Sequence, residues 1–478
     1  MGQEIHNPSF SPQDFATFSR RLREETELLR QWFQEDHFSH RRDVAGFELE
    51  SWLVDEQIQA QADNQRFLQT LADPMVSPEL SRFNVELNTP PTPLQGQALS
   101  RILQSLQQTW SHCEEVAQSL GERMLMIGIP ANLREEQLCL ANMSQMQRYR
   151  ALNEQVLHER RGRPLILDIQ GEEHLHLVHQ DVMLESAATS FQLHLQVPES
   201  EAVRFYNASI IAAAPLVAVS ANAPYAFGKD LWAETRIPLF EQAVDVGGYD
   251  GAAFGPLKRV SFGSDYVRDS LFELFEENLQ HYPVLLPETS AGEAAQMHHV
   301  RLHNGTIWRW NRPLIGFDED GTPHLRIEHR VIPAGPTLVD SVANAAFYYG
   351  LVQSLASAAT APESLIPFST ARDNFTAAAR YGLRARLHWQ LADYHIPMRE
   401  LILEQLLPQA QQGLQQLQLD AEEIERYLGI IRARVESGQN GSQWQRDYVA
   451  AYGRDWSALM QAYYQRQQQQ APVHLWEI

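Results

Sequence analysis

Cysteine is nearly absent from this sequence of 478 residues, which has only Cys113 and Cys139. Neither belongs to a CxxC pair or lies beside a histidine cluster, which argues against a zinc site and a disulfide framework. Long apolar runs are missing too. The most apolar stretch, residues 210–223, contains a proline and two polar residues and is too short to span a bilayer. The N-terminus lacks the features of a secretory signal, so we expect a cytoplasmic protein.

Basic residues are scarce relative to acidic ones. Lys and Arg total 38, whereas Asp and Glu total 60, which gives a formal charge of −22. A surface this acidic repels phosphate backbones and anionic lipids, so we expect no nucleic-acid partner and no membrane partner. The sequence also lacks a Walker-type GxxxxGK[ST] loop, which disfavours a P-loop ATPase, and it lacks GxSxG and HExxH motifs.

The polar and apolar patterns indicate an α+β protein. Alternation predicts strands at residues 44–54, 82–88, 190–197, 306–312 and 324–332, and residues 124–128 are typical of a buried strand. Helical periodicity predicts helices at residues 11–38, 95–120 and 199–214, and an almost entirely helical region from residue 338 onward. Because strands and helices do not alternate regularly, an antiparallel sheet is favoured over a doubly wound parallel sheet.

The length of the chain favours a large catalytic domain with an appendage. We place the catalytic domain at residues 1–360 and a helical C-terminal extension at residues 361–478. The extension has no motif with an evident function, and it could be a lid, a dimer surface or a prop that only packs. Its Gln-rich stretch, residues 465–470, predicts a fraying end.

Several predicted strands carry polar side chains two residues apart, and such side chains point to the same face of a sheet. The pairs are Glu48 with Glu50, Gln192 with His194, and Glu328 with Arg330, and a fourth group, Glu79 and Glu86, flanks another strand. Each pair alone is typical of a strand with one face in water. Carboxylates gathered on one sheet, however, need a counter-ion. Magnesium is the natural one, because it takes oxygen ligands and bridges them to substrate phosphates.

These residue types favour an ATP-dependent ligase. An amine does not attack a carboxylate at neutral pH until a carboxylate oxygen becomes a leaving group. Transfer of the γ-phosphoryl group of ATP provides one by forming an acyl phosphate, which the amine then attacks. This transfer requires metal ions and arginine to neutralise charge, and it requires no nucleophile from the protein.

An ordered series of short motifs resembles the glutamate–cysteine ligases and their carboxylate–amine ligase relatives. The motifs are Gly46–Glu50 (GFELE), Ser77–Pro90, Ser190–Val197 (SFQLHLQV), Pro215–Pro224 and His324–Arg330 (HLRIEHR). Each motif is short, but their order and spacing make the set specific. The resemblance implies a glutamine-synthetase-like fold, in which a curved antiparallel sheet forms a funnel with helices outside.

The resemblance also implies roles for individual residues, with Mg²⁺ or Mn²⁺ as the metal and ATP as co-substrate. Arg330 would contact phosphate and act in catalysis with Glu328, while Arg236 would anchor a substrate carboxylate and Asn222 would shape that pocket. Gln192 stands where the family often has histidine, and we expect it at the nucleotide or substrate edge. The implied metal ligands are Glu48, Glu50, Glu79, Glu86 and Glu328, with His194 near the same cluster.

The reaction implied by the resemblance joins the γ-carboxylate of glutamate to the amine of cysteine, the first step to glutathione. Nothing in the sequence identifies a thiol pocket, so a different amine acceptor is an open alternative. A non-catalytic binding protein on the same fold is a second alternative, although every acidic pair is present. A guanidino-phosphotransferase is disfavoured, because neither cysteine lies in a suitable context. We expect a monomer or a homodimer.

Overall fold

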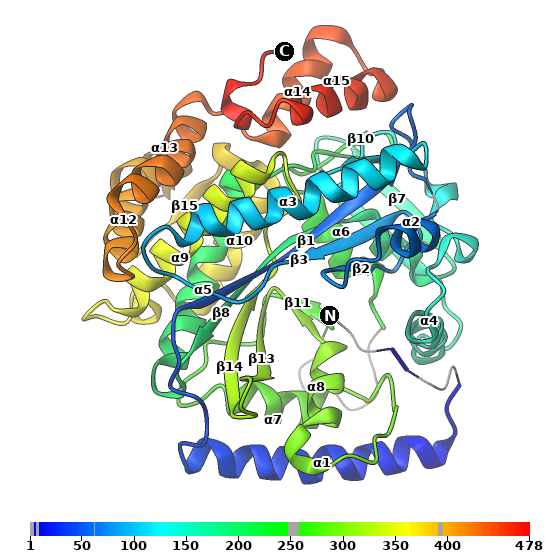
Figure 1. Cartoon of the computed structure of the whole chain (residues 1–478), viewed down its shortest axis with the longest axis vertical. Helices are drawn as coiled ribbons and strands as arrows, with labels where there is room; N and C mark the ends of the chain where they lie inside the picture. The colour runs from blue at the N-terminus through cyan, green and yellow to red at the C-terminus, as the bar shows by residue number, and fades with distance from the viewer. Residues whose placement is uncertain (1–3, 6–8, 62, 247–257, 391–394) are drawn as a thin grey trace.

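The computed structural model describes residues 4–5, 9–61, 63–246, 258–390 and 395–478. Its centre is a curled sheet whose main path has the strand order β13-β14-β8-β1-β3-β2, with β4 and β5 also paired to β1 (Figure 1). All pairings in this sheet are antiparallel, as the sequence predicts. Its strands are β1 (Val44–Val54), β2 (Val76–Pro78), β3 (Asn84–Asn88), β4 (Thr92–Pro93), β5 (Arg123–Leu125), β8 (Phe191–Val197), β13 (Asn311–Phe317) and β14 (Pro323–His329).

Smaller two-stranded sheets lie outside the main sheet. They are β6 (Leu165–Gln170) with β7 (His174–His179), β9 (Tyr225–Ala226) with β10 (Lys229–Asp230), β11 (Val260–Ser261) with β12 (Trp308–Arg309), and β15 (Arg386–His388) with β16 (His395–Pro397). The β15–β16 pair interrupts a region that the sequence predicts as helical almost throughout.

Helices surround the main sheet (Figure 1). They are α1 (Pro12–Gln34), α2 (Asn64–Leu71), α3 (Ala98–Ser119), α4 (Gln147–Glu159), α5 (Glu199–Ser220), α6 (Arg236–Ala243), α7 (Phe272–His281), α8 (His298–Gly305), α9 (Leu338–Ala356), α10 (Phe368–Tyr381), α11 (Met398–Leu401), α12 (Leu407–Gln416), α13 (Ala421–Ser437), α14 (Gly441–Tyr452) and α15 (Trp456–Gln468). The α+β class predicted from the sequence is therefore confirmed.

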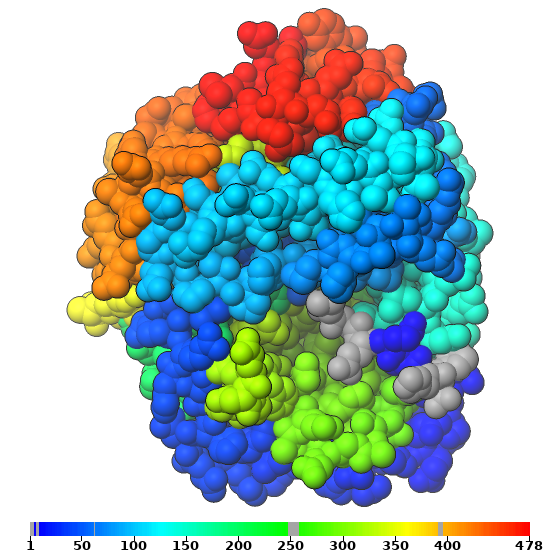
Figure 2. Space-filling view, viewed as in Figure 1, coloured from blue at the N-terminus to red at the C-terminus, as the bar shows by residue number. Residues whose placement is uncertain are grey.

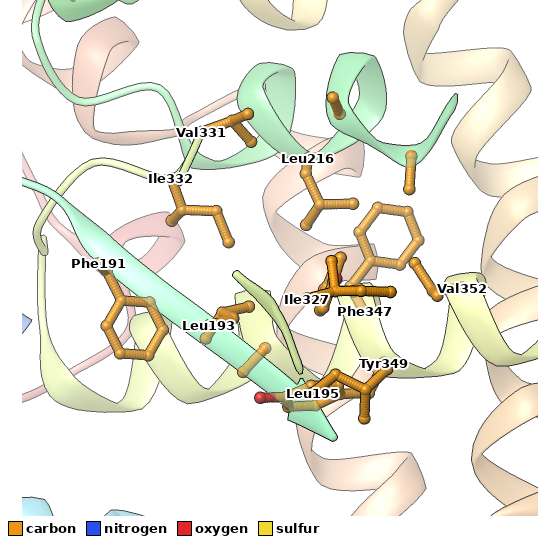
Figure 3. Close-up of a cluster of buried hydrophobic side chains, with 14 of the residues drawn as sticks. Phe191, Leu193, Leu195, Leu216, Ile327, Val331, Ile332, Phe347, Tyr349 and Val352 are labelled. Carbon is orange, nitrogen blue, oxygen red and sulfur yellow. The ribbon is translucent and has the colours of Figure 1, made fainter. Parts of the chain in front are cut away.

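One face of the sheet is apolar and is covered by α5 and α9. Phe191, Leu193 and Leu195 of β8 gather with Leu216 of α5 and Tyr349 of α9 in a buried cluster (Figure 3). Because successive side chains of a strand alternate between faces, the even-numbered residues of β8 point the other way. The apolar packing thereby fixes which side chains reach the polar face of the sheet.

Helix α5 is the central helix of this apolar layer. It is 22 residues long and continues through Pro215 to Ser220, beyond the end that periodicity predicts. Among the described residues, it alone has the length and composition of a helix that could cross a membrane, but 89% of its most apolar window is buried inside the protein. That burial is typical of a core helix.

The helices after residue 361 pack directly on this layer. Helix α10 lies against α5, and α12 and α13 lie against α9, so helices on both sides of residue 360 share one apolar core. The domain boundary at residue 360 stays a prediction.

The prediction of a fraying Gln-rich end is wrong. Helix α15 continues to Gln468, and the side chain of Gln467 is fully buried. Its Oε1 accepts from the backbone N–H of Met126 at 3.0 Å, and its Nε2 donates to the carbonyl oxygen of Met126 at 2.7 Å. A glutamine amide can satisfy buried backbone groups, so composition alone does not indicate exposure here.

The crossing of α9 and α12 depends on two glycines. A Cβ added at Gly413 would overlap the carbonyl oxygen of Gly350. We therefore expect Gly413→Ala to lower the free energy of unfolding by about 1–3 kcal/mol through overpacking. Gly429 of α13 is the control, because a Cβ there meets nothing within 4 Å, and alanine should stabilise the helix by about 0.5–1 kcal/mol. Thermal unfolding of both variants measures the difference, and equal midpoints would contradict this account of the crossing.

Candidate active site

The polar face of the sheet opens into a cavity, here called the carboxylate cavity, that most of the predicted site residues line. Figure 2 looks toward this face, which is hollowed between the blue chain around β2 and β3 and the green chain around α8. The sequence rule that residues two apart share a face thus places the predicted pairs correctly. The predicted residues that line the cavity are Glu48, Glu50, Glu79, Glu86, Gln192, His194, Glu328 and Arg330.

Strand register brings these side chains together from four different strands. Three pairs of these residues face each other directly on neighbouring strands, a position in which Cβ atoms are about 4.5–5.5 Å apart. The opposed pairs are Glu48 with Gln192, Glu50 with Glu86, and His194 with Glu328.

Glu48, His194 and Glu328 form a group with the dimensions of a cation site. One ligand atom of each lies within 4.8 Å of the other two. His194 Nε2 is 3.1 Å from Glu48 Oε1 and 4.0 Å from Glu328 Oε1. Oxygen ligands on opposite sides of Mg²⁺ are about 4.2 Å apart, so these three side chains fit a small hard cation.

Two arginines hold Glu328 in place. Arg312 donates from Nε to Oε2 at 2.7 Å and from Nη2 to Oε1 at 3.0 Å, and Arg330 donates from Nη1 to Oε2 at 3.1 Å. Burial raises the pKa of Glu328, but the charges of Arg312 and Arg330 outweigh it and lower that pKa to about 2. Glu328 is therefore a carboxylate at neutral pH. The charge of His194 acts similarly on Glu48, whose pKa is well below its usual range despite burial.

The other carboxylates lack such support, because Glu50, Glu79, Glu86 and Glu185 form no ion pair with the described arginines and lysines. Burial and the charge of Glu48 raise the pKa of Glu86 to about 7. Burial and the charge of Glu50 raise the pKa of Glu185 to about 8. Burial and the charge of Glu86 raise the pKa of Glu79 well above its usual range. These carboxyl groups place oxygen donors in a part of the cavity that is short of positive charge, which favours a cation beside them.

Gln192 connects the two carboxylate groups. Its Nε2 donates to Glu50 Oε1 at 2.9 Å, and its Oε1 accepts a hydrogen bond from Arg330. Ser190, at the start of β8, donates to Glu50 from its backbone N–H at 2.6 Å and from its Oγ at 2.7 Å. Gln192 therefore lies between Glu50 and Arg330 within the cavity.

Arg236 is not among the residues that line the cavity and is buried behind them. It is the first residue of α6 and is only 2% exposed. Its guanidinium donates to the carbonyl oxygens of Arg330, at 3.3 Å, and of Val331, and lies 3.5 Å from Glu234. The structure therefore uses Arg236 to hold the backbone that carries Arg330.

Asn222 is also outside the lining residues and is fully buried. Its Nδ2 donates to the carbonyl oxygen of Ala334 at 2.9 Å and to the hydroxyl of Tyr463 at 2.8 Å. Its backbone N–H donates to Glu234 at 2.8 Å. The side chain thus joins the end of α5 to the loop after β14 and to α15.

Arg301 and Arg326 line the cavity on the side of Glu48 and Glu328, and their side chains make no hydrogen bond or ion pair with the described residues. Burial lowers the pKa of both guanidinium groups, and the charge of Arg326 lowers the pKa of Arg301 further. Arg326 is half-buried and Arg301 is exposed at the cavity, and two neighbouring guanidinium groups without an anionic partner favour an anionic ligand.

Sequence patterns did not predict these two arginines or several other lining residues. The two-residue spacing that selects Glu328 and Arg330 also reaches Arg326, so the same rule could have found it. No comparable signal marks the residues of helices and turns, because their place in the cavity depends on tertiary packing. The missed polar residues are Arg148 and Tyr149 of α4, Glu185 of a 3₁₀ turn (Val182–Ala187), His298, Arg301 and Asn304 of α8, Thr306 directly after α8, Arg312 of β13 and Arg326 of β14.

Comparisons with known proteins bear on the fold and on the family of this chain. The crystal structure of a glutamate–cysteine ligase from Francisella tularensis, in complex with AMP, matches with a TM-score of 0.60 and 13% identity over 92% of this chain and 91% of that chain. A bifunctional glutathione synthetase from Pasteurella multocida matches with a TM-score of 0.48 and 13% identity over 92% of this chain and 54% of that chain. No curated protein matches the sequence significantly. The first match confirms the predicted fold. Residues 44–472 match the model of the glutamate–cysteine ligase family 2, and the chain therefore belongs to that family.

Proposed function

We propose that this protein is an ATP- and magnesium-dependent ligase that joins the γ-carboxylate of glutamate to the amine of cysteine through an acyl phosphate. Membership of the glutamate–cysteine ligase family supports a ligase of the carboxylate–amine class. The observation that carries the proposal is the convergence of acidic side chains from separate strands on one cavity. The converging ligands are Glu48, Glu50, Glu79, Glu86, His194 and Glu328.

The residues present would hold two divalent cations, Mg²⁺ or Mn²⁺. Glu48, His194 and Glu328 would hold one, since their ligand atoms already lie within 4.8 Å of one another. Glu50, Glu79 and Glu86 would hold the other; burial raises the pKa of each of these carboxyl groups. Bound there, the cations would neutralise phosphate oxygens and the charge that develops during phosphoryl transfer.

Arginines of the cavity supply the remaining positive charge. Arg330 is fixed by Glu328 and Gln192, so it can offer its guanidinium to the transferred phosphoryl group in one orientation. Arg301 and Arg326 are assigned to the rest of the phosphate chain, because they lie on the same side of the cavity without anionic partners. Planar guanidinium donors suit phosphate oxygens.

The role of the protein in this chemistry is to position and to neutralise. An oxygen of the glutamate γ-carboxylate attacks the γ-phosphorus and the bond to ADP breaks. The amine nitrogen then bonds to the acyl carbon, phosphate leaves, and the nitrogen loses a proton. Neither step forms a bond to a protein side chain. Fixed charges such as Glu328 with its two arginines act without reorganising during the reaction.

The acceptor is the least constrained part of the proposal. The name of the family supports cysteine as the acceptor, and a different amine acceptor is the alternative. The wall of the cavity includes Leu152, Leu286, Leu302 and Trp308, which suit the apolar part of many amines. Either acceptor uses the same residues for phosphoryl transfer.

An acceptor panel tests the reaction itself. With ATP, magnesium, glutamate and cysteine, we expect ADP release coupled to a product of the mass of γ-glutamylcysteine. Each other amino acid or amine is offered separately, and both ADP and product mass are followed. Coupled release only with another amine would establish the alternative acceptor, and no release with any combination would contradict the ligase assignment.

Neutral replacements test the metal ligands. Glu50→Gln and Glu328→Gln should each lower kcat by roughly 10²–10³-fold, because each removes a fixed charge used in the transition state. Glu115→Gln, an exposed glutamate of α3, is the matched control and should retain full activity. Circular dichroism should show the same fold for all three. Near-normal turnover of either cavity variant would mean that the metals bind elsewhere.

Arg236 was expected from the family resemblance to anchor a substrate carboxylate, and we now propose that it acts through the backbone at Arg330. Arg236→Lys should lower the free energy of unfolding, since an ammonium group lacks the planar fork with which the guanidinium reaches two adjacent carbonyl oxygens and Glu234 together. Each buried group left unsatisfied costs about 1–3 kcal/mol. We also expect a lower kcat with little change in KM for glutamate. A large rise in that KM at unchanged thermal stability would instead establish the anchoring role.

A further inference from the structure

Helix α1 contacts α8, a helix in the wall of the carboxylate cavity, through one buried side chain. In Figure 1, α1 lies along the lower edge of the molecule, and it packs against α7 and α8. Glu25 of α1 is 2% exposed and accepts from the backbone N–H groups of His299, at 2.7 Å, and Val300, at 2.9 Å. Free N–H groups at the start of a helix carry partial positive charge and favour a carboxylate. Glu25 therefore caps the N-terminus of α8, although it lies far from α8 in the sequence.

The ring of His299 strengthens this contact. Its Nδ1 lies 2.5 Å from Glu25 Oε1, and its Nε2 accepts from the backbone N–H of Ser290 at 3.3 Å. These two partners together assign the proton to Nδ1. Phe18 of α1 packs edge-on against the same ring, with centroids 5.1 Å apart. Both side chains of the contact are buried.

Helix α8 needs such support because its start is strained. Met297, directly before it, has φ of +50°, a left-handed conformation that is costly for a residue with a side chain. The helix also forms much of the cavity wall. The residues of α8 that line the cavity are His298, Arg301, Leu302, Asn304 and Gly305.

The same arrangement occurs at a second wall helix. Glu4 accepts from the backbone N–H groups of Gln147, at 3.2 Å, and Arg148, at 3.0 Å, which begin α4. Next to it, Ile5 is buried in a small apolar cluster with Ala151 and Leu286. Glutamates of the N-terminal region thus cap both α4 and α8. Each of these helices contributes an arginine to the cavity, Arg148 from α4 and Arg301 from α8.

Arg301 is held less firmly than Arg312 and Arg330. Arg312 and Arg330 are held by Glu328, whereas the side chain of Arg301 makes no hydrogen bond or ion pair with the described residues. It lies over the ring of Phe317, at 5.6 Å from the centroid, which orients the group only weakly. Its place in the cavity is therefore set by the place of α8.

We propose that Glu25 is a positioning residue for substrate binding: it fixes α8 so that Arg301, beside Arg326, meets the phosphate chain of the nucleotide. The inference rests on the proposed function for the identity of that anion. Through Glu25, α1 would contribute to the geometry of the active site, although the family match begins only at residue 44.

A double-mutant cycle tests this role. Glu25→Gln should weaken ADP binding by calorimetry and raise KM for ATP, each roughly tenfold, the scale of one charge-assisted hydrogen bond, with a smaller effect on kcat. Because Glu25 acts through Arg301, the same change made in an Arg301→Gln background should alter ADP binding less than about twofold. Glu25→Asp, which keeps the charge, should recover most of the affinity.

Glu24→Gln is the matched control, since Glu24 is the exposed neighbour that pairs with Arg20 at 3.2 Å. Equal ADP affinity in Glu25→Gln and Glu24→Gln would overturn the inference. So would an equal loss in both arginine backgrounds, which would indicate a general loss of structure. Failure of the proposed function would look different, because the unaltered protein would then neither bind ADP nor release it with any substrate.

Discussion

Carboxylates of the cavity repel one another, and the protein must hold them together against this repulsion. Glu50, Glu79 and Glu86 lie in one cavity, where burial and neighbouring negative charge raise the pKa of Glu79 and of Glu86. Such a group opposes folding unless a framework holds it and cations neutralise it. The arrangement is costly for a protein that only needs to fold, and it is useful for one that must bind metal ions and phosphates together.

The apolar face of the same strands holds these carboxylates in place. Leu193 and Leu195 pack under α5 and α9, and their alternation with Gln192 and His194 leaves the polar side chains no other direction to point. Two buried side chains outside the cavity lining also hold the backbone near the site. Gln467 of α15 binds the backbone at Met126, and Arg236 binds the backbone at Arg330. Distant parts of the chain thereby hold the geometry of one site.

The sequence predicted the strands of the site better than its helices and turns. Strand β1 has the bounds that alternation gives, Val44–Val54, and Glu48 and Glu50 share the face that the rule assigns. Periodicity reports which face a side chain takes, and strand pairing then brings those faces together. It carries no information on packing between distant elements. Glu185, on a short turn, and Arg301, on a helix of eight residues, therefore gave no signal, and the place of Arg236 beneath the cavity could not be foreseen.

The proposed reaction begins with transfer of a phosphoryl group from ATP to a substrate carboxylate. This transfer can be followed with glutamate labelled with ¹⁸O in its γ-carboxylate, in the presence of the acceptor amine that supports turnover. If an acyl phosphate forms, the oxygen that bridged carbon and phosphorus leaves with the phosphate. We therefore expect one ¹⁸O atom in each inorganic phosphate released, together with ADP. Unlabelled phosphate, or release of AMP and pyrophosphate instead of ADP, would rule out transfer of the γ-phosphoryl group to the carboxylate.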